Sequence, residues 1–153
     1  DGLYVTNAVK HFAWEPRGKR RLHRRPLPAE VEACGGWLRE ELADVRPRVV
    51  VALGATAVGA LTGWKESVRD ARHELLRSPS GIRVVATWHP SAILRAPAPV
   101  AARMRDELAD DLARAARLAA EEAAEAGADE AELEPQRGAH AAPVANQPAV
   151  AAQ

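Results

Sequence analysis

Short, mostly apolar runs are the feature that most constrains how this chain folds. They cover residues 3–9, 49–53 and 82–87 and are rich in β-branched residues, which is typical of buried strands. Between and after these runs, apolar residues recur at three- and four-residue steps, as they do on one face of a helix. Strands that alternate with helices indicate an α/β domain, with a central, mostly parallel sheet covered by helices.

Two segments carry the clearest helical pattern. The first begins near Pro28, a residue that suits the first turn of a helix, and ends before Pro47. The second runs from about residue 100 to about residue 126, with apolar residues four positions apart. We also predict a short helix over residues 55–61 that stops at Gly63, and an edge strand near residues 74–76. Residues 10–28 show no period and are predicted to form a long exposed loop.

The length of 153 residues suits one domain, which we place at residues 1–126. Residues 127–153 consist mostly of Ala, Pro, Glu and Gln, with almost no large apolar side chain, so we predict a disordered tail. The apolar runs are too short to cross a membrane, and one cysteine fits a reducing, cytoplasmic location. The first residue is Asp, and an apolar run follows almost at once, so we expect an N-terminally truncated, incomplete domain.

The formal net charge of zero hides two unlike regions. Residues 1–105 hold 18 Lys and Arg against 10 Asp and Glu, whereas residues 106–134 hold 2 Arg against 11 acids. A basic body suggests a polyanionic partner. Cations are densest at residues 17–25, where they either form a solvated loop or hold phosphates. The candidate phosphate contacts are Lys19, Arg20, Arg21, Arg24 and Arg25.

Three polar side chains are candidates for chemistry. His23 lies inside the basic loop, whose cations favour the neutral imidazole; the alternative role for such a histidine is a phosphate contact. His89 follows a predicted buried strand, and ligands of α/β sheets bind at the carboxyl ends of strands. Ser91 is a candidate cap of the next helix, and the alternative is a plain turn with a structural histidine. Asn7 ends the first strand, and its amide suits either a base edge or a turn.

Four stretches of the chain read as motifs: residues 4–12 (YVTNAVKHF), 19–23 (KRRLH), 49–57 (VVVALGATA) and 89–95 (HPSAILR). Together they resemble the uracil-DNA glycosylase superfamily. More narrowly they resemble the UdgX branch, close to family 4, whose specific mark is a Lys-Arg-Arg-Ile-His loop; here Leu22 replaces the Ile. The resemblance covers about residues 2–118 and implies a three-layer α/β/α fold.

The resemblance implies excision of uracil from DNA through a flipped-out nucleotide. Asn7 then binds the uracil edge, and His89 stabilises the departing base. His23 attacks the sugar and stays attached, which traps the protein on the DNA. The resemblance assigns contacts with DNA to Ser91, Leu94 and Arg95. We expect the partner to be uracil-containing DNA, preferably single-stranded, and the protein to be a monomer that does not bind membranes. The alternative functions are turnover glycosylase chemistry and non-catalytic DNA binding.

The resemblance also implies a 4Fe–4S cluster. Cys34 falls at one ligand position, and His11 stands where family 4 has a cysteine. The helical period by itself favours a buried core thiol for Cys34. We expect two further ligands, and a Gly-rich motif with an acidic residue, upstream of residue 1. Residues 1–153 alone are therefore expected to hold no complete cluster and to excise no uracil.

Overall fold

The structure is a computed structural model that describes residues 2–133 and 149–152. Its strands are β1 (Leu3–Thr6), β2 (Trp14–Arg17), β3 (Arg20–His23), β4 (Val49–Leu53), β5 (Leu76–Arg77), β6 (Arg83–Thr87) and β7 (Ala149–Ala152). Its helices are α1 (Pro28–Val45), α2 (Gly54–Thr62), α3 (Val68–Ala71), α4 (Pro90–Arg95) and α5 (Ala98–Leu133). No described helix is long and apolar enough to cross a membrane.

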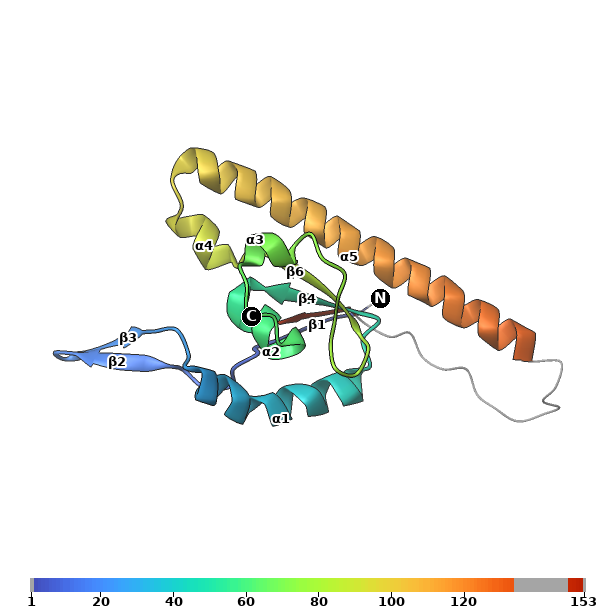
Figure 1. Cartoon of the computed structure of the whole chain (residues 1–153), viewed down its shortest axis with the longest axis horizontal. Helices are drawn as coiled ribbons and strands as arrows, with labels where there is room; N and C mark the ends of the chain where they lie inside the picture. The colour runs from blue at the N-terminus through green and yellow to red at the C-terminus, as the bar shows by residue number, and fades with distance from the viewer. Residues whose placement is uncertain (1, 134–148, 153) are drawn as a thin grey trace.

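A sheet with strand order β1-β7-β4-β6-β5 forms the middle of the molecule. The pairs β1–β7, β7–β4 and β4–β6 are parallel, and β5 pairs antiparallel with β6. Helices α1 and α2 cover one face, and α5 crosses the other (Figure 1). The predicted three-layer α/β/α architecture with a mostly parallel sheet is confirmed.

Strand β4 is apolar at every position, and its packing on both faces explains why. Val50 packs with Leu38 of α1 and Val58 of α2, whereas Val49 packs with Ala115 of α5. Successive side chains of a strand point to opposite faces, so a strand covered on both faces needs apolar residues at every position. The same reason holds for Val84, Val85 and Ala86 in the middle of β6. Both strands lie where the sequence predicts them, apart from one residue at the start of β6.

Strand β1 differs from the prediction of a buried strand over residues 3–9. It ends at Thr6, and the side chains of Leu3 and Val5 are 71% and 56% exposed. Among the described residues, β1 pairs with β7 only and lies at the edge of the sheet. An apolar run indicates a strand, but its burial depends on what the tertiary structure places against it.

The predicted disordered tail is wrong for the part of it that the structure describes. Helix α5 continues to Leu133, because a segment rich in Ala and Glu has a high helix propensity. Residues 149–152 form β7, which lies between β1 and β4, and Ala152 is fully buried there. Backbone hydrogen bonds of a ladder can hold such a strand without large side chains. Residues 134–148 and 153 lie outside the described residues.

The predicted irregular loop over residues 10–28 contains the antiparallel hairpin β2–β3, which extends away from the sheet (Figure 1). Gly18 turns the chain with a φ of 60°, a conformation that favours glycine. The predicted edge strand near residues 74–76 appears two residues later as β5. Helix α1 begins at Pro28 and ends before Pro47, as predicted.

Candidate functional site

His89 lies at the junction of β6 and α4 and is itself the N-cap of α4. Its Nδ1 accepts a hydrogen bond from the backbone N–H of Ser91 at 3.0 Å, and the Ser91 hydroxyl lies 2.8 Å from the same nitrogen. The prediction that Ser91 caps the helix is therefore wrong, because the imidazole takes that role. Since Nδ1 accepts a hydrogen bond, the hydrogen of the neutral ring is assigned to Nε2.

Gly54 packs directly against His89. It follows β4 with a φ of 84°, and a Cβ atom at this position would lie 2.9 Å from the Cβ of His89. Only glycine combines that backbone conformation with so close an approach. The sequence did not lead us to predict Gly54 as a site residue. A glycine directly after a predicted central strand is a signal that could have identified it.

The surroundings of His89 lower its pKa below the usual 6.5. Burial is the largest cause, because it disfavours the charged imidazole, and the positive charges of Arg95 and His23 add to it. His89 is thus kept neutral, with Nε2 as its donor.

His23 ends β3 and lies on a mixed aromatic and basic face of the hairpin. Directly opposite residues of a hairpin share a face, and His23 is paired with Trp14. The ring of Phe12 lies 5.3 Å from that of His23, between centroids, and the Arg21 guanidinium lies 4.5 Å from the centre of the Trp14 ring. Arg20 points to the opposite face, so the predicted basic cluster is divided between two faces.

Arg24 makes contacts unlike those predicted for a phosphate clamp. Its guanidinium donates two hydrogen bonds to the Glu30 carboxylate, at 2.8 and 2.7 Å, which tie the hairpin to the first turn of α1. The hydrogen bonds from Arg24, with another from the Leu27 backbone, lower the pKa of Glu30 to about 2. Lys19 lies in the hairpin turn, and Lys19 and Arg25 are exposed.

The remaining predicted site residues lie at the same edge of the sheet. Strands β1, β4 and β6 run parallel, so Asn7, Gly54 and His89 all follow carboxyl ends. Strand β7 separates β1 from β4, which puts the end of β1 about 14 Å from that of β6. Asn7 is exposed, as are Arg95 and Leu94, which is 86% exposed on α4.

The two predicted cluster ligands lie side by side. His11 Nδ1 is 3.3 Å from the Sγ of Cys34, which also accepts a hydrogen bond from the Lys10 backbone N–H. Cys34 is buried, as its place on the apolar face of α1 predicts. This pair suits a soft metal or cluster, but the described residues hold no group of three or more His, Cys, Asp or Glu arranged to bind a metal.

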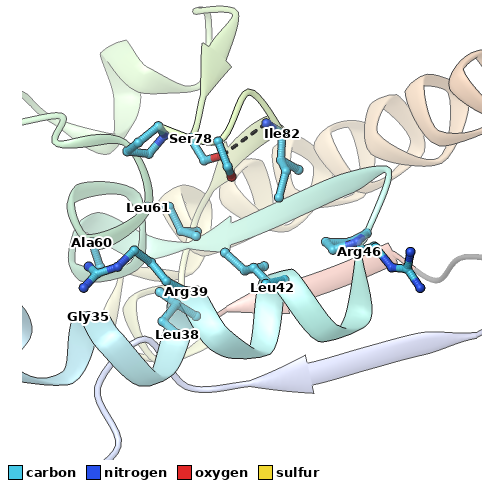
Figure 2. Close-up of a pocket in the computed structure, with 13 residues that line it drawn as sticks. Gly35, Leu38, Arg39, Leu42, Arg46, Ala60, Leu61, Ser78 and Ile82 are labelled. Carbon is cyan, nitrogen blue, oxygen red and sulfur yellow. Dashed lines mark hydrogen bonds between the residues drawn. The ribbon is translucent and has the colours of Figure 1, made fainter.

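A cavity of about 460 Å³ lies between α1, α2 and the segment over residues 78–82 (Figure 2). Leu38, Leu42 and Leu61 line it, and Arg39 and Arg46 belong to its wall. None of the predicted site residues contributes to the lining. The cavity is therefore separate from the edge of the sheet that carries His89.

Comparisons with known proteins identify the family of this chain. A family model described as the uracil DNA glycosylase superfamily matches residues 1–113. The chain is 40% identical over 92 residues to a type-5 uracil-DNA glycosylase of Pyrobaculum aerophilum, which covers 60% of this chain and 37% of that protein. It is 39% identical over 96 residues to a type-4 uracil-DNA glycosylase of Thermotoga maritima, covering 62% and 46%.

A third relative extends the matched region. The chain is 29% identical over 125 residues to a type-4 uracil-DNA glycosylase of Archaeoglobus fulgidus, covering 77% of this chain and 57% of that protein. The chain thus spans between 37% and 57% of the length of these three relatives. The family model covers well over half of the chain. The chain belongs to the uracil DNA glycosylase superfamily, close to its type-4 members.

Proposed function

We propose that this chain supplies the reactive histidines of a protein that excises uracil from DNA and traps itself on the product. The observation that carries the proposal is a pair of histidines from separate elements. His89 accepts a hydrogen bond at Nδ1, which leaves Nε2 as its donor, and His23, when protonated, is one of the charges that lower the pKa of His89. The relatives are named uracil-DNA glycosylases, which supports the substrate.

His89 stabilises the departing base. Cleavage of the N-glycosidic bond moves its electron pair onto uracil, whose ring becomes negatively charged. A neutral imidazole donates a hydrogen bond from Nε2 to that charge and does not have to give up a proton first. Asn7, at the same edge of the sheet, offers an amide donor and acceptor to the uracil edge.

His23 takes the place of the water molecule that attacks in hydrolysis. Loss of uracil leaves an oxocarbenium-like sugar that is electron-poor at C1′. The ring nitrogen of His23 without a hydrogen donates its lone pair to C1′, and a C–N bond forms. The proton on the other ring nitrogen passes to solvent, and uracil takes up a proton from solvent, so atoms and charge balance.

The exposed cations hold the strand for this reaction. Lys19, Arg20, Arg21 and Arg25 contact phosphates, while Arg24 fixes the hairpin through Glu30. Leu94, with Arg95 beside it, fills the space that a flipped nucleotide leaves, and its exposed apolar side chain suits that role. Ser91 orients His89 and contacts the strand. Single-stranded DNA is the preferred form, because a base outside a duplex needs no unpairing.

A 4Fe–4S cluster is the proposed cofactor, with Cys34 and His11 as two of its ligands. Their separation of 3.3 Å supports shared ligation, and such a cluster takes four ligands. No step of the proposed reaction runs through the cluster. The proposal assigns residues 1–126, together with strand β7, to the glycosylase-like unit of a cytoplasmic monomer.

A denaturing gel tests the proposal. The longest polypeptide that contains these residues is mixed with labelled single-stranded DNA that carries one uracil. We expect a shifted band that survives denaturation. Abasic DNA without a shifted band would mean turnover glycosylase chemistry, and unreacted DNA would mean a DNA-binding module. Residues 1–153 alone are expected to leave the DNA unreacted, and uracil release by them would contradict that part of the proposal.

Substitution of the nucleophile identifies the attachment point. His23→Ser should abolish the shifted band, because a hydroxyl lacks the lone-pair reactivity of a neutral imidazole. His73→Ser is the matched control: His73 is also exposed, but it follows α3, away from the hairpin. A shifted band that persists in His23→Ser would remove His23 from the mechanism.

A further inference from the structure

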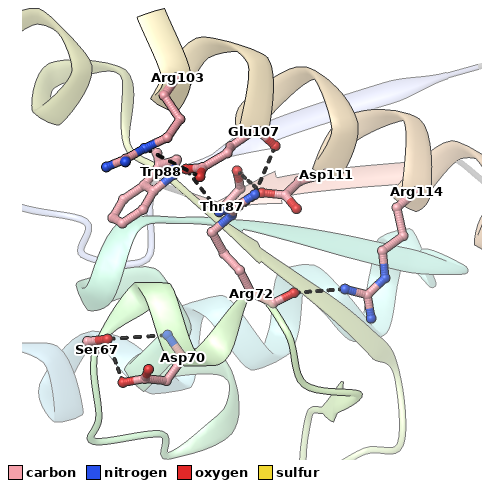
Figure 3. Close-up of polar contacts among 9 residues, drawn as sticks. All are labelled: Ser67, Asp70, Arg72, Thr87, Trp88, Arg103, Glu107, Asp111 and Arg114. Carbon is pink, nitrogen blue, oxygen red and sulfur yellow. Dashed lines mark hydrogen bonds and ion pairs between the residues drawn. The ribbon is translucent and has the colours of Figure 1, made fainter. Parts of the chain in front are cut away.

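Arg72 lies in a buried polar network between α3 and α5 (Figure 3). Only 8% of Arg72 and 6% of Asp111 is exposed. The Arg72 Nε–Asp111 Oδ2 distance is 2.5 Å, and Arg72 Nη1 lies 3.0 Å from the Glu107 carboxylate. Among the described residues, no buried side-chain nitrogen or oxygen lacks a hydrogen-bond partner, so the network is fully satisfied.

The same carboxylates reach the two residues that precede His89. Asp111 Oδ2 accepts a hydrogen bond from the Thr87 hydroxyl at 2.7 Å, and Glu107 accepts one from the Trp88 indole at 2.6 Å (Figure 3). The Arg72 guanidinium also lies 5.6 Å from the centre of the Trp88 ring. Thr87, the last residue of β6, and Trp88, which links it to the reactive imidazole, are therefore both held by side chains of α5.

The network also includes the backbone of residues 72–74. Arg114 of α5 donates hydrogen bonds to the backbone carbonyls of Arg72 and Glu74, at 2.9 and 3.3 Å. Buried charges are a poor way to gain stability, because well-packed apolar residues bind two elements together at least as well. Charged hydrogen bonds do, however, fix distances and angles. This contrast points to a need for fixed geometry at the end of β6.

We propose that Arg72, Asp111 and Glu107 are positioning residues for His89, which they hold over Gly54 through Thr87 and Trp88. The inference rests on the proposed function of His89 for its meaning, but its geometry does not depend on DNA. The groups that act directly on His89 are Ser91 and Arg95 from α4, His23 from β3 and Gly54. None of the three positioning residues is among these, so they act through the chain.

The test is the pH titration of His89 by NMR in the 153-residue chain. Its ring resonance is assigned by its loss in His89→Gln, and the Trp88 indole N–H resonance reports whether the network is intact. The test variants are Asp111→Asn and Glu107→Gln. The matched control is Glu122→Gln, which removes another carboxylate between β6 and α5: Glu122 lies 2.7 Å from Arg83, at the opposite end of β6.

We expect the His89 midpoint to rise toward about 6.5 in both test variants, because a loosened junction admits water. The lost negative charge by itself shifts a nearby histidine the other way, so a rise reports movement. Glu122→Gln should leave the midpoint unchanged. The proposal is overturned if the indole resonance shifts in the test variants while His89 titrates as in the wild type.

Thr87→Val keeps the test decisive if a charged variant fails to fold. It removes one hydrogen bond to Asp111 and preserves a β-branched shape in a strand. A smaller upward shift of the His89 midpoint supports the proposal, and no shift overturns it. Because no DNA is present, a failed gel assay would refute the uracil reaction and leave this result standing.

Discussion

The β2–β3 hairpin and the β6–α4 junction each present one histidine, and they do so in opposite ways. In the hairpin, His23 is exposed and contacts Phe12 through ring packing. At the junction, His89 is half-buried, caps a helix and follows two residues tied to α5. The same contrast holds for arginine: Arg21 lies on an exposed indole, whereas Arg72 is enclosed by carboxylates.

This difference indicates a division of labour. Exposed side chains on a hairpin can meet a strand of DNA from solvent, where their charges act over several ångströms. The junction is buried and its enclosed polar side chains are all hydrogen-bonded, so it does not extend toward ligands in solvent. It can, however, hold one hydrogen-bond donor where negative charge develops on a reacting group. Four substitution experiments sharpen this contrast.

The largest expected effect is in the buried network. Asp111→Ala leaves Arg72 without its closest carboxylate, and a broken buried pair typically lowers the free energy of unfolding by about 3–5 kcal/mol. Glu30→Ala breaks the more exposed ion pair between Glu30 and Arg24, and it should lower the free energy of unfolding far less. Urea unfolding of both variants measures the difference, and equal losses would contradict the distinction between the two regions.

Gly54→Ala should have the next largest effect. An added Cβ must meet the Cβ of His89, in a backbone conformation that alanine adopts poorly, so we expect a loss of about 2–4 kcal/mol. Gly81→Ala is the matched control, because Gly81 has a φ of 88° and nothing within 4 Å of an added Cβ. Its loss should be about 1 kcal/mol. Similar losses in urea unfolding would show that contact with His89 is unimportant.

The pH dependence of stability isolates His89 next. Its pKa in the folded chain lies below the usual 6.5, so the unfolded chain binds the proton more tightly. The contribution of His89 is fully present above about pH 6.5 and is lost as the pH falls from there through the folded-state value. Unfolding free energies of the wild type and His89→Gln, measured across this window, should converge at lower pH. A constant difference would contradict the shift.

The smallest effect concerns the hairpin and appears only in DNA binding. Arg21→Ala should reduce the slope of log affinity against log salt by about 0.7 on single-stranded DNA, as expected for one lost phosphate contact. Arg24→Ala should reduce it less, because that guanidinium is already bound to Glu30. Fluorescence anisotropy at several salt concentrations measures both slopes. A larger effect of Arg24 would reverse the assigned roles.

Local pattern was enough for much of the fold. The apolar runs at β4 and β6 and the period of α1 predict those elements almost to the residue, because burial on known faces leaves a signature in sequence. The exposure of β1 and the place of β7 were missed. Both depend on which strands become neighbours, and an alanine-rich segment such as residues 149–152 carries no apolar pattern of its own.

The candidate site divides along the same line. Sequence alone indicated which residues are candidates for chemistry, such as His23 and His89, because these stand in motifs that resemble a family. Only the tertiary structure decided what supports them: Gly54 packs against His89, and the Arg72–Asp111 pair, 39 positions apart in the chain, holds Thr87 two residues before His89. The identity of a side chain is local, whereas its protonation and orientation depend on neighbours distant in the chain, and those are set by packing.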